Sequence, residues 1–281
     1  MQNYIKYTIV LVTSILFSCE DVIDVDVQND SERLVIEASL DWEKGTNGNN
    51  QTIELRKSTP FFDTTSITAV TGASVRVTNN ANGTEFEFVD QNNGSYTTDE
   101  FVPLINQSYT LEIIYNDEVY RATETLNAVP DITDLFQGTE DGFDDEILEA
   151  HVVFTDPPEE GNNYLFRYDF EDEILPELEI GDDQFINGNE IDWWYEQEED
   201  EDTDKIEVLV PGDVVAIEMY GISEAYYDYM DILIDQIGGV GIFSATPVSV
   251  KGNCVNLTTP DNYAHGYFRL TEVNKASYTF E

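Results

Sequence analysis

Basic residues are scarce in this sequence. Twelve lysines and arginines stand against 58 aspartates and glutamates in 281 residues, which gives a formal net charge of −46 at pH 7. A nucleic-acid-binding protein needs a cationic surface to displace counterions from phosphates, so this composition excludes nucleic acid as a partner. Hydrophobic residues still make up 41% of the chain, which is enough for folded cores.

Histidine and cysteine are almost absent. His151 and His265 lie far apart, and neither has a histidine or cysteine nearby at metal-ligand spacing, which argues against a histidine-ligated zinc or haem site. We interpret both histidines as structural. The motifs HExxH and GxSxG and the P-loop are missing as well. Carboxylates are so abundant that a pair suited to acid–base catalysis arises by chance. The sequence therefore predicts no catalytic residue, no cofactor and no enzyme activity.

A hydrophobic run long enough to span a membrane is missing from the start of the chain. The apolar segment Tyr7 to Phe17 has about eleven residues, whereas a membrane-spanning helix needs about 20. These proportions are typical of a secretory signal peptide. Ser18 precedes Cys19, and Leu16 lies two residues further back, which looks like the lipobox of a bacterial lipoprotein. We predict a signal peptide at residues 1–18 and lipid attachment at Cys19. Ordinary signal cleavage beside an incidental cysteine, or an uncleaved anchor, are the alternatives.

The residues after the predicted cleavage site are acidic. Removal of residues 1–18 takes away one lysine and no acid, so the mature chain has a formal charge of 11 − 58 = −47. Such a chain has no electrostatic attraction to anionic lipid headgroups, so the covalent lipid must anchor it. Residues 19–31 are predicted to form an acidic tether. With Cys19 acylated, Cys254 has no partner in the chain, which excludes a disulfide framework.

Residues 32–128 have the alternating pattern of short β-strands. The turn at Asn79–Gly83 contains residues that adopt positive φ at low cost, which predicts a hairpin, and a second hairpin crosses Asn116–Asp117. The expected strands are residues 34–40, 52–57, 73–78, 85–89, 109–115 and 119–126, with another after Gly94. Seven or so strands in about 95 residues predict an immunoglobulin-like β-sandwich over residues 32–128.

The segment Val129–Pro130–Asp131 breaks this pattern and is the predicted domain boundary. We expect residues 129–281 to form a β-rich domain, sandwich-like or barrel-like, with one amphipathic helix over residues 223–237. Ser223 can cap this helix. Its apolar face repeats at helical spacing through Tyr226, Met230, Leu233 and Ile237. The predicted fold class is therefore mainly β.

Aromatic residues supply the candidate binding contacts. If Ile191, Trp193 and Tyr195 face inward on a strand, Trp194 faces outward between two acidic side chains. An outward tryptophan in an acidic segment suits contact with a sugar face or a partner protein, whereas core packing of both tryptophans is the alternative. Two helix tyrosines pose the same choice. The candidate contacts are Trp193, Trp194, Tyr195, Tyr227 and Tyr229.

Acidic segments raise the question of a metal ion. Residues 140–146 and 196–204 gather carboxylates that suit Ca²⁺, and Asp182–Asp183 with nearby asparagines is a third candidate. Neither long segment matches the EF-hand spacing. We favour the alternative interpretation, which is solvated acidic loops, and predict no metal ligand.

Several segments carry a resemblance to a known family. They are the strand 215–220 that leads into the helix, PVSVKGN at 247–253, AHGYF at 264–268, CEDVIDVD at 19–26 and LVIEA at 34–38. Together they resemble a lipoprotein family of Bacteroidota that is catalogued as domain of unknown function four-two-four-nine. The resemblance spans nearly the whole mature chain. It implies an outer-membrane lipoprotein, often encoded beside a TonB-dependent receptor, and it supplies no catalytic residues. Glu20–Asp21 also loosely resembles an export tag of surface-exposed lipoproteins.

These observations lead to one main hypothesis. The chain is expected to be a non-catalytic lipoprotein of the outer membrane, exposed at the cell surface or facing the periplasm. Its expected role is binding or docking for a TonB-dependent uptake system. A surface adhesin or a structural envelope protein is the first alternative, and a hydrolase with a carboxylate pair is the last.

The lipobox prediction can be tested at Cys19. The substitution Cys19→Ala removes the thiol that receives the lipid, so we expect no lipid incorporation and an accumulation of unprocessed precursor. Metabolic labelling with a fatty acid and the mass of the purified chain would measure both effects. Cys254→Ala is the matched control and should be processed normally. Normal processing of Cys19→Ala would contradict the lipobox.

Overall fold

The computed structural model describes residues 31–60, 63, 65–142, 147–171, 173, 175–197, 208–238 and 248–281. The predicted signal peptide, Cys19 and nearly all of the predicted tether lie outside the described residues, as do parts of both long acidic segments. The chain divides into two compact units, residues 1–31 with 60–64 and residues 32–59 with 65–281. The fold below is that of the second unit. None of its described helices is long and apolar enough to cross a membrane.

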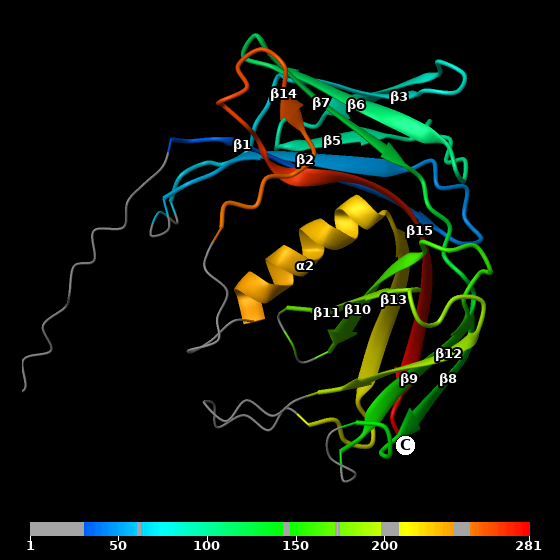
Figure 1. Cartoon of the computed structure of the whole chain (residues 1–281). Coiled ribbons are helices and arrows are strands. Elements are labelled where there is room, and N and C mark those ends of the chain that lie inside the picture. Colours follow the sequence, from blue (N-terminus) through cyan, green and yellow to red (C-terminus); the bar gives the residue numbers. More distant parts are fainter. Residues whose placement is uncertain are drawn as a thin grey trace, which may run out of the picture. The chain divides into compact units, whose positions relative to one another are not determined.

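Seven strands in the N-terminal half enclose a first core. They are β1 (Leu34–Glu43), β2 (Gln51–Lys57), β3 (Ser74–Asn79), β4 (Glu85–Asp90), β5 (Ser95–Thr98), β6 (Ser108–Tyr115) and β7 (Glu118–Thr125). Strand β4 pairs with both β5 and β3, so one continuous sheet folds over and places β1, β2 and β5 opposite β3, β6 and β7 (Figure 1). Alternate side chains such as Ile36, Ile53 and Tyr96 fill the space between the layers and have no exposed surface.

Seven further strands build a second layered region. They are β8 (Ile132–Gly138), β9 (Glu149–Thr155), β10 (Asn163–Phe170), β11 (Glu177–Asp182), β12 (Glu190–Glu196), β13 (Val214–Ile222) and β15 (His265–Thr279). The short strand β14 (Val255–Asn256) instead pairs with β7 in the first region. Strands β11, β10, β13 and β15 extend the 12-stranded sheet, whereas β12, β9 and β8 form a separate 3-stranded sheet. A second core, which includes Val152, Phe166 and Met219, lies between the two sheets.

Helix α2 (Glu224–Gly238) covers the other face of the large sheet and contacts β10 and β11. Strand alternation turns Leu165 and Tyr220 toward the helix, where they join Tyr226 and Met230 in a third apolar cluster. Ser223 caps the helix, because its Oγ accepts a hydrogen bond of 3.2 Å from the backbone N–H of Tyr226. Tyr226, Met230 and Leu233 of the predicted apolar face thus lie in this cluster, whereas the side chain of Ile237 lies outside the described part of the chain.

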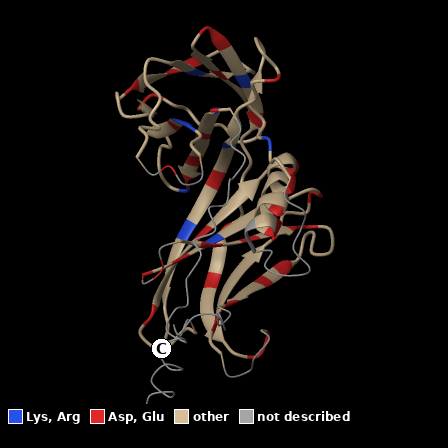
Figure 2. Cartoon of the chain, turned by 90° about the vertical axis from the view of Figure 1, so that its left-hand side faces the viewer, with Lys and Arg blue, Asp and Glu red and all other residues tan. Residues whose placement is uncertain are grey.

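The mainly β fold class is confirmed. The hairpin between β6 and β7 is also confirmed, with positive φ at Asn116 (50°) and Asp117 (61°). Strand β8 was not predicted, and the segment that contains β11 and β12 has a mixed pattern in the sequence. Figure 2 shows acidic residues on strands throughout the fold and far fewer basic ones.

Strand β15 belongs to both halves of the fold. It pairs in parallel with β1 from Val35↔His265 to Glu43↔Val273, and it then pairs antiparallel with β13. The predicted boundary at Val129 does mark a change of core, since Leu126 belongs to the first core and Val129 to the second. However, the chain later returns to the first core with Cys254, Ala264, Phe268 and Leu270. A single boundary therefore does not describe how the sequence is shared between the cores.

Gly252 and Asn253 fix the position of the segment with which the chain returns to the first core. A Cβ on Gly252 would collide with the carbonyl oxygen of Gly266, and a Cβ on Gly266 would collide with that of Ile36. Gly266 also has a φ of +86°, which glycine adopts without strain. The side-chain amide of Asn253 bonds to the backbone of Phe268 in the way that a residue of a neighbouring strand would. It donates to the Phe268 carbonyl at 2.8 Å and accepts from the Phe268 N–H at 2.9 Å.

A buried ion pair ties β15 to β1. The Arg269 side chain is 8% exposed, and its Nη2 lies 2.7 and 2.9 Å from the two carboxylate oxygens of Asp41. The guanidinium also lies over the rings of Tyr220 and Tyr226, 4.7 and 5.1 Å from their centroids. Burial acts to lower the pKa of Arg269, but the interactions with Asp41, Tyr226 and Tyr220 together outweigh it and the pKa is raised. The arginine thus remains charged within the fold.

The bridging role of Asn253 predicts a loss of stability on substitution. Asn253→Ala leaves the N–H and the carbonyl of Phe268 without their partner, so we expect the free energy of unfolding to fall by about 1–3 kcal/mol. Asn253→Asp keeps the acceptor and loses the donor, so it should also destabilise the fold. Urea denaturation would measure both changes. The exposed control Asn47→Ala should stay within about 0.5 kcal/mol of the parent. An Asn253→Ala protein as stable as that control would contradict the bridge.

Candidate functional site

Strand β12 carries three of the five candidate contacts. Trp193 and Tyr195 point into the second core, where the Trp193 ring stacks on Phe166 with centroids 4.7 Å apart. Trp194 lies on the opposite face of the strand, directly across from His151 of β9. The predicted alternation along β12 is therefore confirmed, although Trp194 is half-buried and not fully exposed.

A buried histidine lies between two carboxylates on that outer face. His151 and Glu149 are two residues apart on β9, so strand alternation puts both on the same side, where they are 2% and 0% exposed. The Nε2 atom of His151 lies 2.9 Å from Glu149 Oε2, and its Nδ1 atom lies 2.8 Å from Asp192 Oδ1 of β12. Phe136 of β8 stacks on the imidazole with centroids 4.4 Å apart. Three strands thus position this group.

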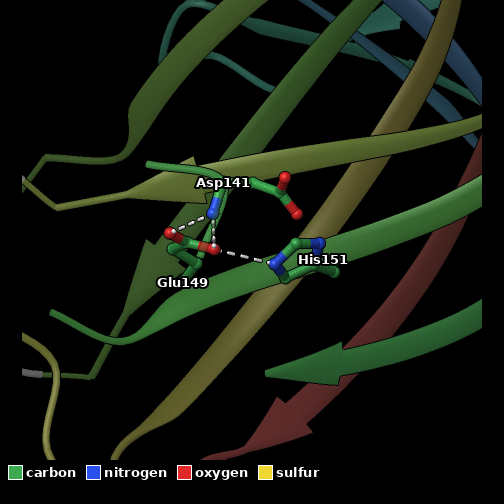
Figure 3. A group of neighbouring side chains, drawn as sticks. All are labelled: Asp141, Glu149 and His151. Carbon is green, nitrogen blue, oxygen red and sulfur yellow. Dashed lines mark hydrogen bonds and ion pairs between the residues drawn. The ribbon is translucent and has the colours of Figure 1, made fainter. Parts of the chain in front are cut away.

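The segment before β9 adds hydrogen-bond donors to this group. Glu149 Oε1 accepts hydrogen bonds from the backbone N–H groups of Asp141 (3.1 Å) and Gly142 (2.5 Å). The carboxylate of Asp141 comes near the same place, as Figure 3 shows. One ligand atom each from Asp141, Glu149 and His151 lies within 4.8 Å of the others. These are the described residues that could hold a metal ion.

Two chemical states fit this geometry. A neutral imidazole has one N–H, whereas both ring nitrogens of His151 face carboxylate oxygens. The ring can carry two protons, or it can bind a metal ion through Nε2 while Asp192 holds Nδ1–H, as carboxylates commonly do beside metal-bound histidines. Since two backbone amides and His151 already satisfy Glu149, the network is complete with protons alone. In the sequence, this group is indicated by the spacing of Glu149 and His151, which are two residues apart on one strand. Asp141 and Asp192 come from other segments, so the sequence does not show that they join the group.

A groove of about 770 Å³ opens beside this group, between β11, β12 and helix α2. Its volume lies within the range of roughly 300–1,000 Å³ that is usual for ligand sites. It is lined by Glu177, Leu178, Glu179, Asp192, Trp193, Trp194, Tyr195, Glu196, Gln197 and Ile234. The groove thus combines the three aromatic residues of β12 with four carboxylates, and none of these described lining residues is basic.

The indole of Trp193 bridges the two strands that border the groove. Its Nε1 donates a hydrogen bond of 2.9 Å to Glu179 Oε2 on β11. Its six-membered ring lies against Gly181, where a Cβ would collide with it. Burial raises the pKa of the Glu179 carboxyl, while the bond from Trp193 acts to lower it. Glu179 is thus a half-buried acid whose main described role is to hold an indole in place.

The two helix tyrosines do not line this groove. Tyr229 lines a smaller hollow of about 300 Å³ with residues 248–253, and its ring centroid is 4.9 Å from that of Tyr267. Tyr227 packs with the apolar cluster under the helix. The structure therefore brings together Trp193, Trp194 and Tyr195 and leaves the two tyrosines elsewhere.

The fold and the groove define a class of protein: a mainly β chain with one helix and an acidic, tryptophan-lined groove between two sheets. The chain belongs to the family described as "Domain of unknown function (DUF4249)", whose model matches residues 20–277. This match confirms the resemblance to domain of unknown function four-two-four-nine. No curated protein matches the chain significantly.

Several solved structures have a partial likeness to this chain. A two fibronectin type-III domain segment from chicken tenascin is 14% identical, covers 61% of this chain and 84% of its own, and has a TM-score of 0.22. The chicken interferon gamma receptor alpha chain is 13% identical, with 68% and 89% covered and a TM-score of 0.23. A cytokine receptor complex is 10% identical, with 69% and 86% covered and a TM-score of 0.26. These TM-scores are too low to support an inference about this chain.

The raised pKa of Glu179 predicts a pH dependence of stability. A raised pKa in the folded state means that the folded chain holds this proton more tightly than the unfolded chain. The contribution is therefore fully present below the ordinary pKa of 4.5 and is lost as the pH rises through the raised value. Glu179→Gln keeps an acceptor for Trp193 and cannot ionise, so its stability relative to the parent should increase as the pH rises.

Urea midpoints from acid conditions to about pH 8 would measure this difference. Glu177→Gln, at an exposed position on the same strand, is the matched control and should show a smaller pH-dependent difference. A constant offset between Glu179→Gln and the parent at every pH would contradict the raised pKa.

Proposed function

We propose that this chain is a non-catalytic, lipid-anchored protein of the outer membrane that binds or docks for a TonB-dependent uptake system. The groove between β11 and β12 carries the binding part of the proposal. The lipobox at Ile15 to Cys19 and the resemblance to an outer-membrane lipoprotein family support the location and the kind of partner.

The composition of the groove favours recognition. Trp194 contributes a large, flat, half-buried side chain, which is the type of residue that dominates the energy of protein and sugar interfaces. Trp193 is held from both sides, by its bond to Glu179 and by its stacking on Phe166. A rigid aromatic surface binds with little loss of side-chain entropy, so the groove is suited to a partner that docks without chemical change.

The carboxylates of the groove also favour binding. Glu179 accepts the indole hydrogen of Trp193, and Asp192 bonds to His151 Nδ1. Each of these oxygens therefore positions a neighbouring side chain. A hydrolase would instead need one carboxyl kept protonated and a second kept ionised, both directed at the substrate. This arrangement supports binding over hydrolysis.

Co-purification from outer membranes tests the proposal. The full chain with a C-terminal tag should be expressed at its native level, extracted in mild detergent and analysed by mass spectrometry. We expect a TonB-dependent receptor to co-purify, and we expect deletion of the gene to impair growth on one nutrient. Trp194→Ala should reduce the co-purified receptor by about tenfold or more, as the loss of a buried aromatic contact does.

A control separates the groove from the rest of the surface. Ile67→Ala, at a position that is 89% exposed in the first layered region, should leave co-purification unchanged. Both variants should be checked for a parent-like unfolding midpoint. If no receptor co-purifies and the deletion strain grows on every nutrient but attaches poorly, the adhesin alternative replaces this proposal.

A further inference from the structure

Among the strands that the structure describes, one that forms a wall of the groove is the terminal strand of its sheet. Strand β11 is the first in the order of the 12-stranded sheet, with β10 as its neighbour. The outer backbone N–H and C=O groups of a terminal strand form a template on which another extended chain can pair. Peptide-binding domains use this mode, in which main-chain hydrogen bonds give affinity and side-chain pockets give specificity.

The charge of the lining selects the sign of the ligand. Glu177, Glu179, Asp192 and Glu196 line the groove. The described lining contains no lysine or arginine, and the whole chain has only 12 such residues against 58 acids. A low-dielectric cleft of one charge sign concentrates ligands of the other sign. The groove is therefore complementary to a cationic ligand and repels an acidic one.

The apolar lining indicates an extended peptide and not a small cation. Leu178, Trp194 and Ile234 also face the groove, so the carboxylates alternate with apolar surface. Successive side chains of an extended peptide point in opposite directions. A peptide with basic residues at alternate positions would direct them to the carboxylates and its other residues to the apolar wall. Trp194 can in addition accept a lysine or arginine over its ring face.

We propose that the groove binds an extended segment of a partner polypeptide that carries lysine or arginine at alternate positions and pairs with β11 as an added strand. This inference rests on the proposed binding function and specifies the chemistry of the partner. Strand β11 has 6 residues, so the bound segment should cover a similar number. At about 3.3 Å per residue, such a segment is roughly 20 Å long.

Binding of a designed peptide tests this. The probe is a blocked hexapeptide of alternating lysine and valine, titrated into the full-length protein in detergent and followed by calorimetry. We expect saturable one-to-one binding. A glutamate–valine hexapeptide should not bind. A lysine–valine peptide with N-methyl groups on alternate amides loses the strand-pairing donors and should bind about tenfold more weakly or worse, since several hydrogen bonds are lost.

Protein variants locate the peptide. Glu177→Lys reverses one charge at an exposed position of β11, and we expect affinity to fall by about tenfold. Glu100→Lys makes the same change in net charge at an exposed position of the first layered region and should bind like the parent. On peptide binding, hydrogen exchange should slow in residues 177–182 and remain unchanged in β7, residues 118–125.

Three results would overturn the proposal. They are equal binding of the N-methylated peptide, equal binding to Glu177→Lys and Glu100→Lys, or equal binding of spermidine in place of the peptide. The titration uses purified protein and does not depend on a receptor. Peptide binding without receptor co-purification would thus leave the groove chemistry intact and refute the transporter role, whereas the reverse result would place receptor docking at another surface.

Discussion

Strand β15 hydrogen-bonds to β1 along its first half and to β13 along its second half, and both cores rely on these two ladders. Phe268 and Leu270 belong to the first core, whereas Tyr267 and Val273 belong to the cluster under helix α2. Arg269 lies between them and brings a buried charge that Asp41 of β1 neutralises. Removing Asp41 would leave the charge of Arg269 unpaired in the interior, which is among the most costly changes a fold can undergo. The two layered regions are therefore coupled through one strand.

Several of the few basic residues form ion pairs with acids on the sheets. Arg76 and Arg121 both bond to Glu112, and the bond from Arg121 is the main reason why the pKa of Glu112 is lowered. Lys275 pairs with Glu218 at 2.6 Å across the β13–β15 ladder. These described cations neutralise acids on the sheets, where strand pairing would otherwise bring like charges together. The lining of the groove has a different composition, with acids and aromatic residues.

The sequence could predict features that depend on local periodicity. Alternation along β12 gave the opposite orientations of Trp193 and Trp194, and the helical spacing of Tyr226 and Met230 gave the buried face of α2. It could not predict pairings between distant segments. Neither the parallel register of β1 with β15 nor the meeting of His151 with Asp192 leaves a local pattern, because both depend on how strands from different parts of the chain align. The groove depends on the spacing of two sheets, so the sequence could not predict it either.

The pairing of β1 with β15 has a consequence for when the protein can fold. Val35 is matched with His265, about 230 residues further along, so β1 can pair with β2 early but lacks its second neighbour until nearly all of the chain has been synthesised. Contacts so distant in sequence form slowly. A chain that lacks its last strand would consequently leave one edge of β1 unpaired and the first core without Phe268 and Leu270. The first layered region can therefore reach its final packing only after the C-terminal strand has been made.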